Sequence, residues 1–321
     1  MKHSQLIFSL LGLLFLALSS HAEAQSPFTF STFDVPGATG GTEINDIQGN
    51  NLIGDYVDGA GRHGFVYKGS FYTYLNDPLA TKGTAAASMD GNNIVGTYSN
   101  STGLGTHGFI YNGTSYQTID DPLAQVYGTS ASGISSQTVV GWYRDANSIG
   151  HGFLYNINTQ VFTTLDVPNA TGGTYLFGIS GSTLYGTYYD GAGEHGFVDS
   201  NGIFSTINFP SASSTEVFRG SNGSFIGGYN QVSASHCFLF DGANYVSFDV
   251  PGAQNGLTFP GGVSGNNIVG SYVDKNYIVH GFEATYAPPV DSDTPVMPPW
   301  LMVFLAGLLV LVASRRLPQR S

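Results

Sequence analysis

The tripeptide His63-Gly64-Phe65 recurs along the chain at nearly constant spacing and decides its fold. Successive histidines of the six copies are 44, 44, 44, 41 and 44 residues apart. A fixed period in the low forties is typical of a repeat architecture. The other copies are His107-Gly108-Phe109, His151-Gly152-Phe153, His195-Gly196-Phe197 and His280-Gly281-Phe282, with the variant His236-Cys237-Phe238.

Each repeat contains four short runs of β-forming residues. In the second repeat these runs cover residues 84–89, 94–98, 107–111 and 116–119, and glycine and asparagine separate them. Runs of this length, rich in β-branched and aromatic residues and divided by turn residues, predict four antiparallel strands. The dense glycine-containing turns exclude a long helix from the body of the chain.

Two further features keep the same place in every repeat. A Gly-x-Tyr triplet lies in the second expected strand, and a proline follows the fourth, where its missing N–H removes no ladder hydrogen bond. These features predict an all-β fold, a six-bladed β-propeller of four-stranded antiparallel blades. An open solenoid is the alternative, but it needs polar capping repeats that the sequence does not show. The closing prolines are Pro36, Pro78, Pro122, Pro168, Pro210 and Pro251.

The two ends of the repeat region complement each other. The last His-Gly-Phe is followed by Glu283–Ala287 and then by a proline-rich stretch, so the sixth repeat lacks a fourth strand. Phe28–Pro36 have the pattern of a fourth strand and closing proline, with no repeat before them. We therefore expect the N-terminal strand to complete the last blade, which closes the ring and removes the open edges of the array.

The chain divides into four expected parts. Residues 1–24 have a basic start, an apolar run and a small-x-small site, which predicts a cleaved secretory signal peptide. Residues 25–287 are the six-repeat propeller, residues 288–299 a proline-rich spacer, and residues 300–321 a hydrophobic sorting or anchor segment with an arginine cluster. As a helix, the apolar run within residues 300–321 would extend about 21 Å. This length is short for a permanent membrane span. We expect a transmembrane helix that anchors the protein in the inner membrane at least transiently, with its basic end in the cytoplasm.

The C-terminal segment resembles the tripartite sorting tails of Gram-negative surface proteins, the PEP-CTERM class. The resemblance is carried by Pro298, Pro299 and Trp300, the apolar run after them, and Arg315 and Arg316. This chain departs from the class pattern, Pro-Glu-Pro, by lacking the glutamate. The resemblance implies an exosortase-type processing enzyme as a partner and a location at the cell surface or in the extracellular matrix of a Gram-negative-type bacterium. An ordinary single-pass anchor is the alternative.

The charge and the cysteine content exclude a nucleic-acid-binding protein and a disulfide-stabilised protein. Without Lys2, Glu23 and the three C-terminal arginines, the chain has six basic residues against 21 acidic ones, a net charge of about −15. Nucleic acid is excluded as a partner, because phosphate binding needs clustered lysine and arginine. Cys237 is the only cysteine, so no intramolecular disulfide can form. Because it takes a glycine position within an expected strand, we expect a buried, unreactive thiol.

The repeated histidines are the first candidates for chemistry, since histidine often binds metals or transfers protons. Equivalent positions of six blades are spread around a ring, so we expect a structural role in which each imidazole bonds a turn or a neighbouring strand. We expect the glycine that follows to permit close approach of the adjacent sheet, and the phenylalanine to pack between blades. The six residues are His63, His107, His151, His195, His236 and His280.

Other motifs point away from catalysis. Asp58, Asp145, Asp190 and Asp274 follow Gly-x-Tyr triplets in loops that weakly resemble calcium loops, but one aspartate per loop favours a turn. The sequence has no nucleophile elbow, zinc-protease motif, phosphate loop or cysteine pair. It therefore predicts no catalytic residue, no metal site and no cofactor. The fifth repeat, with Arg219 on its first strand, is the most irregular, which we interpret as drift in a tolerant blade rather than as a binding site.

With all six repeats in view, the chain resembles the bacterial extracellular HAF-repeat family, named for a His-Ala-Phe core near the start of a strand. A Gly-x-Tyr triplet followed by His-Gly-Phe, recurring from Phe28 to Tyr286, carries the resemblance, with glycine at the alanine position in five repeats. The resemblance implies an exported, β-rich repeat protein, and it implies no established activity.

We expect an exported binding or matrix module at the cell surface rather than an enzyme. An acidic surface rich in tyrosine and asparagine favours polar partners, such as extracellular polysaccharide or other cell-envelope components. A glycan-active hydrolase or lyase with carboxylates at the channel mouth is the first alternative, and it requires a carboxylate pair that converges in a pocket. A structural spacer without a small ligand is the second alternative.

Overall fold

The computed structural model describes residues 26–101, 105–231 and 234–288. These residues contain 24 β-strands and no helix, which confirms the expected all-β class. Antiparallel pairing divides the strands into six units of four. Five units follow the order of the chain, and the sixth takes its outer strand from the N-terminal end.

The first three units follow one another along the chain. Unit 1 contains β2 (Gly41–Gln48), β3 (Asn51–Asp58), β4 (Gly61–Lys68) and β5 (Phe71–Leu75). Unit 2 contains β6 (Gly83–Asp90), β7 (Asn93–Ser99), β8 (Thr106–Tyr111) and β9 (Tyr116–Ile119). Unit 3 contains β10 (Val126–Ser135), β11 (Thr138–Arg144), β12 (Gly150–Asn156) and β13 (Val161–Leu165).

The last three units include the one that joins both ends of the body. Unit 4 contains β14 (Gly173–Ser180), β15 (Thr183–Asp190), β16 (Gly193–Ser200) and β17 (Ile203–Ile207). Unit 5 contains β18 (Ser214–Ser221), β19 (Ser224–Gln231), β20 (Ala234–Phe240) and β21 (Tyr245–Phe248). Unit 6 contains β22 (Ala253–Ser264), β23 (Asn267–Asp274), β24 (Val279–Tyr286) and β1 (Phe28–Phe33).

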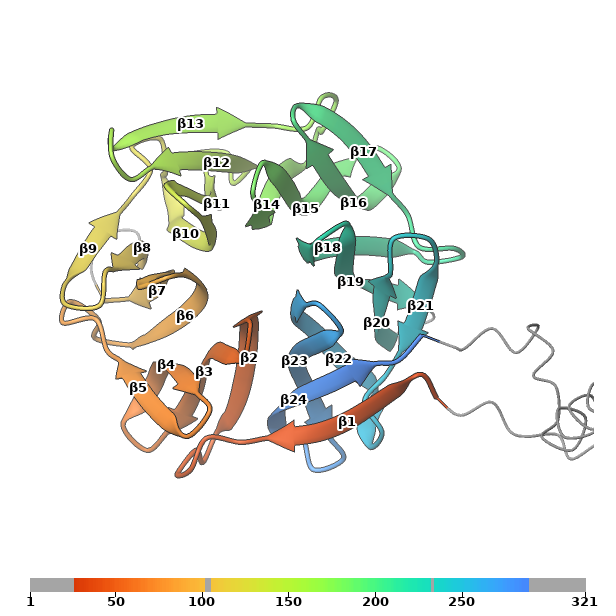
Figure 1. Ribbon diagram of the computed structural model, residues 1–321. Helices are drawn as coiled ribbons and strands as arrows, with labels where there is room; N and C mark the ends of the chain where they lie inside the picture. Colours follow the sequence, from red (N-terminus) through yellow and green to blue (C-terminus); the bar gives the residue numbers. More distant parts are fainter. Residues whose placement is uncertain (1–25, 102–104, 232–233, 289–321) are drawn as a thin grey trace, which may run out of the picture. The chain divides into compact units, whose positions relative to one another are not determined.

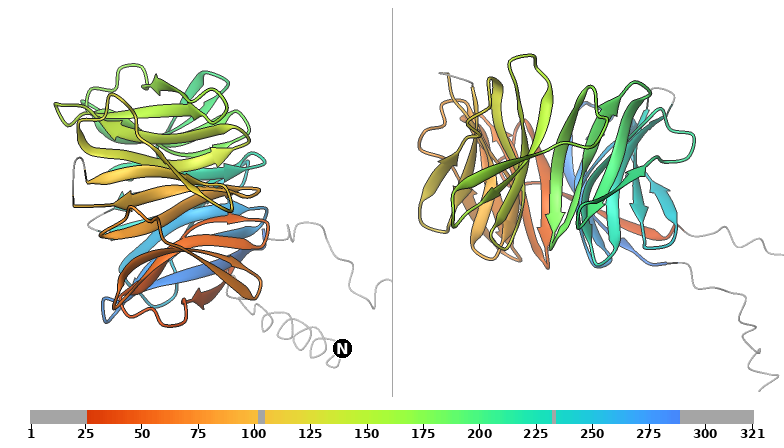
Figure 2. Two further views of the ribbon diagram at one scale, coloured as in Figure 1. Left: turned by 90° about the vertical axis from the view of Figure 1, so that its left-hand side faces the viewer. Right: turned by 90° about the horizontal axis from the view of Figure 1, so that it is seen from above.

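The units lie around a common axis in the manner of a β-propeller (Figure 1). The first strand of each unit is innermost, and the fourth strand is outermost (Figure 1). Edge-on views show one layer of units around the axis (Figure 2). Single parallel bridges, Arg62 to Gly83 and Gly150 to Gly173, link unit 1 to unit 2 and unit 3 to unit 4.

The predicted strands of the second repeat agree with the structure within one residue at each end. The sequence pattern did not show a β-bulge that recurs in the innermost strand of every unit. A bulge leaves one residue unpaired and turns the strand locally. The unpaired residues all line the space around the axis and are Asn45, Ala87, Ser132, Phe177, Phe218 and Gly261.

The phenylalanine of each repeated tripeptide forms the centre of its unit. All six rings are at most 1% exposed. In units 2 to 6, a Cβ on the glycine of the Gly-x-Tyr triplet would lie 2.3–2.9 Å from this ring, so only glycine leaves room for it. The glycine after the histidine faces the next unit, as expected: a Cβ at Gly196 would lie 2.7 Å from Val217, and one at Gly281 would lie 2.8 Å from Ile44.

A buried threonine near the start of each innermost strand fixes the connection from the preceding unit. Its Oγ1 accepts a hydrogen bond of 2.9–3.2 Å from the backbone N–H of the residue before the closing proline. The bond satisfies a buried donor that no ladder reaches. No sequence pattern indicated this role for the six threonines, which are Thr42, Thr84, Thr129, Thr174, Thr215 and Thr258.

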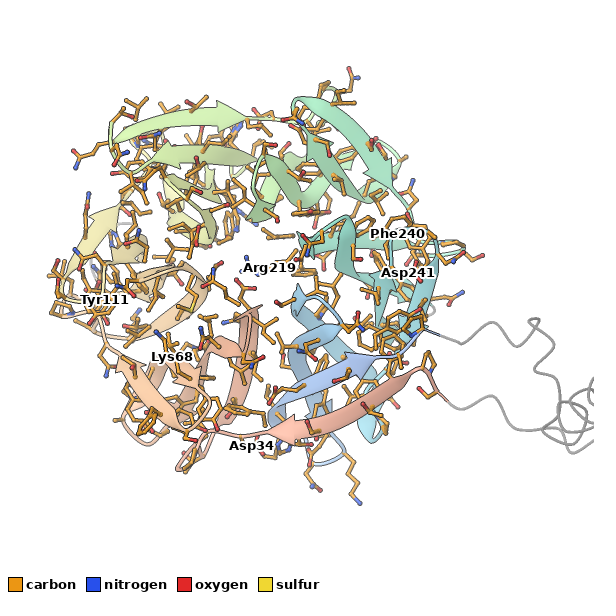
Figure 3. All side chains as sticks on the ribbon, in the orientation of Figure 1. Asp34, Lys68, Tyr111, Arg219, Phe240 and Asp241 are labelled. Carbon is orange, nitrogen blue, oxygen red and sulfur yellow. The ribbon has the colours of Figure 1, made fainter. Side chains whose placement is uncertain are left out.

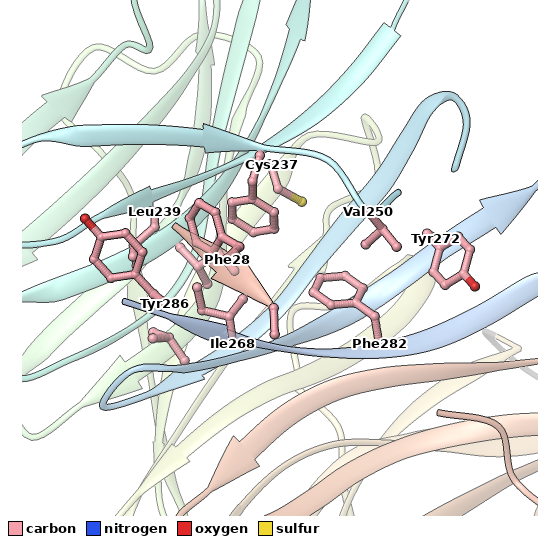
Figure 4. Packing of buried hydrophobic residues seen from close by; sticks show 12 residues of the cluster. Phe28, Cys237, Leu239, Val250, Ile268, Tyr272, Phe282 and Tyr286 are labelled. Carbon is pink, nitrogen blue, oxygen red and sulfur yellow. The ribbon is translucent and has the colours of Figure 1, made fainter. Parts of the chain in front are cut away.

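The N-terminal strand pairs with the last strand of the body. β1 is antiparallel to β24 from Phe28 opposite Tyr286 to Phe33 opposite Gly281, as the complementary ends of the repeat region predicted. Phe28 is 5% exposed and lies in a core cluster with residues of units 5 and 6, including Cys237 (Figure 4). Its ring centroid is 4.6 Å from that of Phe248. β1 therefore contributes apolar burial as well as ladder hydrogen bonds.

The predicted terminal segments lie outside the described residues. This applies to the signal peptide at 1–24 and to the anchor segment with Pro298, Pro299, Trp300, Arg315 and Arg316. In the part of the chain that the structure describes, no helix is long and apolar enough to cross a membrane.

The position of Phe28 generates a stability prediction. Phe28→Ala removes a buried ring from the contact between the two ends of the body, and we expect the free energy of unfolding to fall by about 3–5 kcal/mol. Urea unfolding followed by circular dichroism measures the change. The matched control is Phe71→Ala on β5, where the ring is 78% exposed and the expected change is within about 0.5 kcal/mol. Equal effects of the two substitutions would contradict the assigned role of β1.

Candidate functional site

The six histidines each bridge two parts of their own unit. Nδ1 lies 2.6–3.1 Å from the side chain of the residue two positions before the closing proline. That residue is Asp34, Asn76, Asp120, Asp166, Asn208 or Asp249. Each imidazole also packs on the tyrosine of the Gly-x-Tyr triplet, with ring centroids 4.9–5.3 Å apart. The structure leaves the histidines one to a unit and does not bring them together.

The loop aspartates act as turn acceptors. Asp58 accepts hydrogen bonds from the N–H groups of Ala60 and Gly61, and Asp190 accepts them from the equivalent loop of unit 4. These backbone bonds lower the pKa values of both carboxyls. The second ring nitrogen of His63, Nε2, lies 3.2 Å from Oδ1 of Asp58. Among the described residues, no group of three histidine, cysteine or acidic side chains has the arrangement of a metal site.

Arg219 crosses the axis of the ring from unit 5 (Figure 3). Its Nε donates to the carbonyl of Asn45 at 3.1 Å, and its Nη2 donates to the carbonyls of Ala87 and Ser132 at 2.8 and 2.7 Å. These acceptors are bulge residues of units 1, 2 and 3. Arg219 also lines two pockets near the axis. The irregularity of the fifth repeat thus has a structural role, whereas the sequence pattern alone suggests drift.

A buried carboxylate accompanies this arginine. Asp46 Oδ1 lies 3.6 Å from Arg219 Nε, and Asp46 Oδ2 accepts a hydrogen bond of 2.6 Å from the Ser88 hydroxyl. Burial raises the pKa of Asp46, while Arg219 and Ser88 act in the opposite direction. The three side chains form one polar network across units 1, 2 and 5.

One carboxylate pair converges in a pocket at the axis, next to the bulge residues of units 1 to 3. Arg62 Nη1 contacts both Glu43, at 3.5 Å, and Asp55. Burial, followed by the Glu43 charge, raises the pKa of Asp55 to about 7, with Arg62 opposing the shift. The arginine lies between the two carboxylates and occupies oxygens of both.

A second carboxylate pair joins units 4 and 5. Burial, followed by the charge of Glu194 and a hydrogen bond with it, raises the pKa of Glu216 to about 8. Tyr189 donates its hydroxyl proton to Glu194 at 2.5 Å. Burial beside Glu194 therefore favours the protonated form of the Glu216 carboxyl.

The most distinctive surface feature is a groove over units 2, 3 and 4, which we call the aromatic groove. It consists of two pockets of about 320 and 530 Å³ that share Trp142 and Arg144. The first pocket adds Tyr175 and Tyr189, and the second adds Tyr127. Such volumes and aromatic walls are typical of ligand sites.

The aromatic groove has its own local support. The Trp142 and Tyr175 rings meet edge to face with centroids 5.3 Å apart. A Cβ at Gly150 would lie 2.3 Å from the Tyr175 ring, so a side chain there would displace it. Tyr127 is 63% exposed and has a φ of 61°, a left-handed conformation that costs a bulky residue free energy. It lies at an irregular start of β10, where the register shifts between Val126 and Thr129.

Arg144 lies at the centre of the aromatic groove. Its guanidinium carbon is 5.4, 5.8 and 5.7 Å from the ring centroids of Tyr127, Trp142 and Tyr175. Cation–π attraction of this kind orients the guanidinium. None of the residues of this groove was predicted as a site from the sequence. Trp142 is the one tryptophan of the repeat region, and it is the sequence feature that could have indicated the groove.

Cys237 is fully buried, as expected from its glycine position. Its surroundings raise the pKa of the thiol well above the ordinary value, chiefly through burial. A thiol that stays protonated and inaccessible is a poor nucleophile.

The chain is similar in fold to known β-propeller proteins. No family model matches the chain, and no curated protein matches it. A solved structure assigned as TolB from Agrobacterium tumefaciens is similar, with 12% identity, a TM-score of 0.53, and coverage of 82% of this chain and 99% of that one. This likeness agrees with the β-propeller fold.

Two other structures give lower scores. TolB from Acinetobacter baumannii has a TM-score of 0.45 at 13% identity, and the alignment covers 71% of this chain and 65% of that one, just under two thirds of its length. A triple arginine-to-alanine mutant of AofleA from Arthrobotrys oligospora has a TM-score of 0.46 at 12% identity, with coverage of 82% and 85%.

The Arg219 network generates a prediction about stability. Arg219→Met leaves Asp46 without its cation and three carbonyls without a donor, and we expect a loss of roughly 3–5 kcal/mol in the free energy of unfolding. Adding Asp46→Asn removes the stranded charge, so the double variant should recover part of the loss. Urea unfolding at neutral pH measures both. A double variant less stable than Arg219→Met would contradict the coupling.

Proposed function

We propose that this protein is an exported binding module whose aromatic groove holds a carbohydrate polymer of the cell envelope or extracellular matrix. The observation that carries the proposal is the set of aromatic rings around Arg144, on neighbouring units and open to solvent. Aromatic faces bind the C–H faces of sugar rings by apolar contact, while hydroxyl and guanidinium groups beside them supply hydrogen bonds. Tyr175, Tyr189 and Trp142 combine both kinds of contact in one pocket.

The architecture we propose for this module is a closed ring of six blades, one for each unit. The pairing of β1 with β24 and the packing of β2 against β22, β23 and β24 support it. In such a ring the strands that line the axis are held on both sides by neighbours. The groove then lies on a rigid support, which lowers the conformational entropy lost on binding.

For the six histidines we propose a structural role. Each imidazole joins the third strand of its unit to the segment that leaves the fourth. An equivalent bond in every unit supports a function in folding, because a ligand site on this scaffold would be expected where the units differ.

We propose export and surface attachment through the two terminal segments. The signal-peptide pattern at residues 1–24 and the sorting-tail resemblance at residues 300–321 support this location. The resemblance of the repeats to the HAF-repeat family agrees with it. An exosortase-type enzyme would then process the tail.

Catalysis is the weaker candidate, although a carboxylate pair does converge in a pocket. Glu43 and Asp55 both bind Arg62, so neither is positioned to take up or release a proton at a bound sugar. The spacer alternative gives no reason for an exposed, strained tyrosine beside Arg144. We therefore propose binding as the function.

A substitution in the aromatic groove tests the proposed function. Trp142→Ala removes the ring shared by both pockets, and we expect glycan binding to weaken at least about tenfold, since stacked aromatic residues dominate such contacts. A broad glycan array identifies a ligand for the wild-type protein, and titration calorimetry compares the variants.

Phe71→Ala serves as the matched control, because it removes an exposed ring far from the groove. It should bind like the wild type. Absence of wild-type binding across the array, or equal binding by Trp142→Ala, would overturn the proposal.

Deletion of the tail tests the location. Without residues 300–321, we expect the protein in the periplasm or medium instead of the cell-associated fraction, because the apolar run is the only expected anchor left after signal cleavage. Fractionation and immunoblotting measure the distribution. Unchanged cell association would contradict the sorting-tail assignment.

A further inference from the structure

The charge state of the aromatic groove points to the class of ligand. The repeat region has three arginines, and two of them are neutralised. Arg62 contacts Glu43 and Asp55, and Arg219 contacts Asp46 and three carbonyls. Arg144 has no carboxylate within ion-pair distance among the residues that the structure describes, although acidic residues outnumber basic ones more than threefold.

Within the described part of the chain, no side-chain hydrogen bond from Arg144 is present. Its Nε is buried without a hydrogen-bond partner in the described structure. Leaving a buried donor unpaired costs free energy, and more when the group is charged. The three aromatic faces hold the guanidinium through their π systems, a contact that consumes none of its N–H donors.

From this geometry we propose that the aromatic groove recognises an acidic polysaccharide, with Arg144 binding the carboxylate of a uronic acid residue. The proposal rests on the carbohydrate-binding function proposed above. A guanidinium matches a carboxylate through two parallel N–H···O bonds, and its two terminal Nη groups provide such a pair of donors. A uronic acid carries its carboxylate on the sugar ring itself, so the ring and the charge can reach Trp142 and Arg144 together.

The surrounding charges favour a carboxylated sugar over a polyphosphate. Arg144 is the one cation of the groove, whereas polyphosphate and nucleic acid bind through many cations at once. Glu194 lies near the first pocket and is engaged by Tyr189. A polymer with one charge per sugar ring fits a site with one charged donor between aromatic walls.

The experiment compares two polymers that differ in charge. Calorimetry of the wild-type protein with polygalacturonate and with its fully methyl-esterified form should give about tenfold tighter binding to the acid, the effect expected of one charge-assisted bidentate contact. Arg144→Gln should abolish this preference and retain binding of the ester. Arg144→Lys keeps the charge but loses the fork, and it should restore only part of the preference.

Lys68→Gln is the matched control, because it removes one positive charge from an exposed position outside the groove. It should preserve the preference. Equal binding of the two polymers by the wild type, or an unchanged preference in Arg144→Gln, would overturn the inference and leave the proposed function standing. If the wild type binds neither polymer and no glycan of the array, the proposed function fails as well. Circular dichroism of each variant shows whether it is folded.

Discussion

Contact between a phenylalanine and a glycine on neighbouring strands underlies units 2 to 6 of this protein. The ring of the repeated tripeptide fills the space that the absent side chain of the second-strand glycine leaves open. Protein cores are packed nearly as densely as crystals, so a residue larger than glycine would push the two strands apart. The histidine beside the phenylalanine then orders the turn outside, and the buried threonine orders the connection to the next unit. Three side chains per repeat thus account for much of the fold.

The repeat made most of this architecture predictable. Strand positions followed from β-forming runs between turn residues, and the partner of the N-terminal strand followed from the missing strand of the sixth repeat. The threonines were missed, because a single threonine near the start of a strand has no distinctive sequence pattern. Their effect depends on a backbone N–H six to eight residues away, which becomes visible only in three dimensions.

The candidate site was not predictable to the same degree, for a physical reason. Tyr127 and Arg144 belong to unit 3 and Tyr175 to unit 4, and the sequence gives no measure of which side chains face each other across two units. The same applies to Arg219, whose acceptors lie on three units far away in the chain. A repeat predicts what its copies share, whereas these residues occupy positions where the copies differ. The residues that break the pattern therefore have to be read from the structure.

The pairing of Phe28 with Tyr286 also determines how the protein would respond to mechanical load. The two ends of the body leave it at adjacent positions of one antiparallel pair. A force that separates the ends therefore acts on one hydrogen bond at a time, in a peeling geometry, rather than on the whole ladder in shear. For a molecule tethered at one end only, no force acts to separate the two ends from each other. A tether at both ends would open unit 6 first, while the aromatic groove on units 2 to 4 would be strained later.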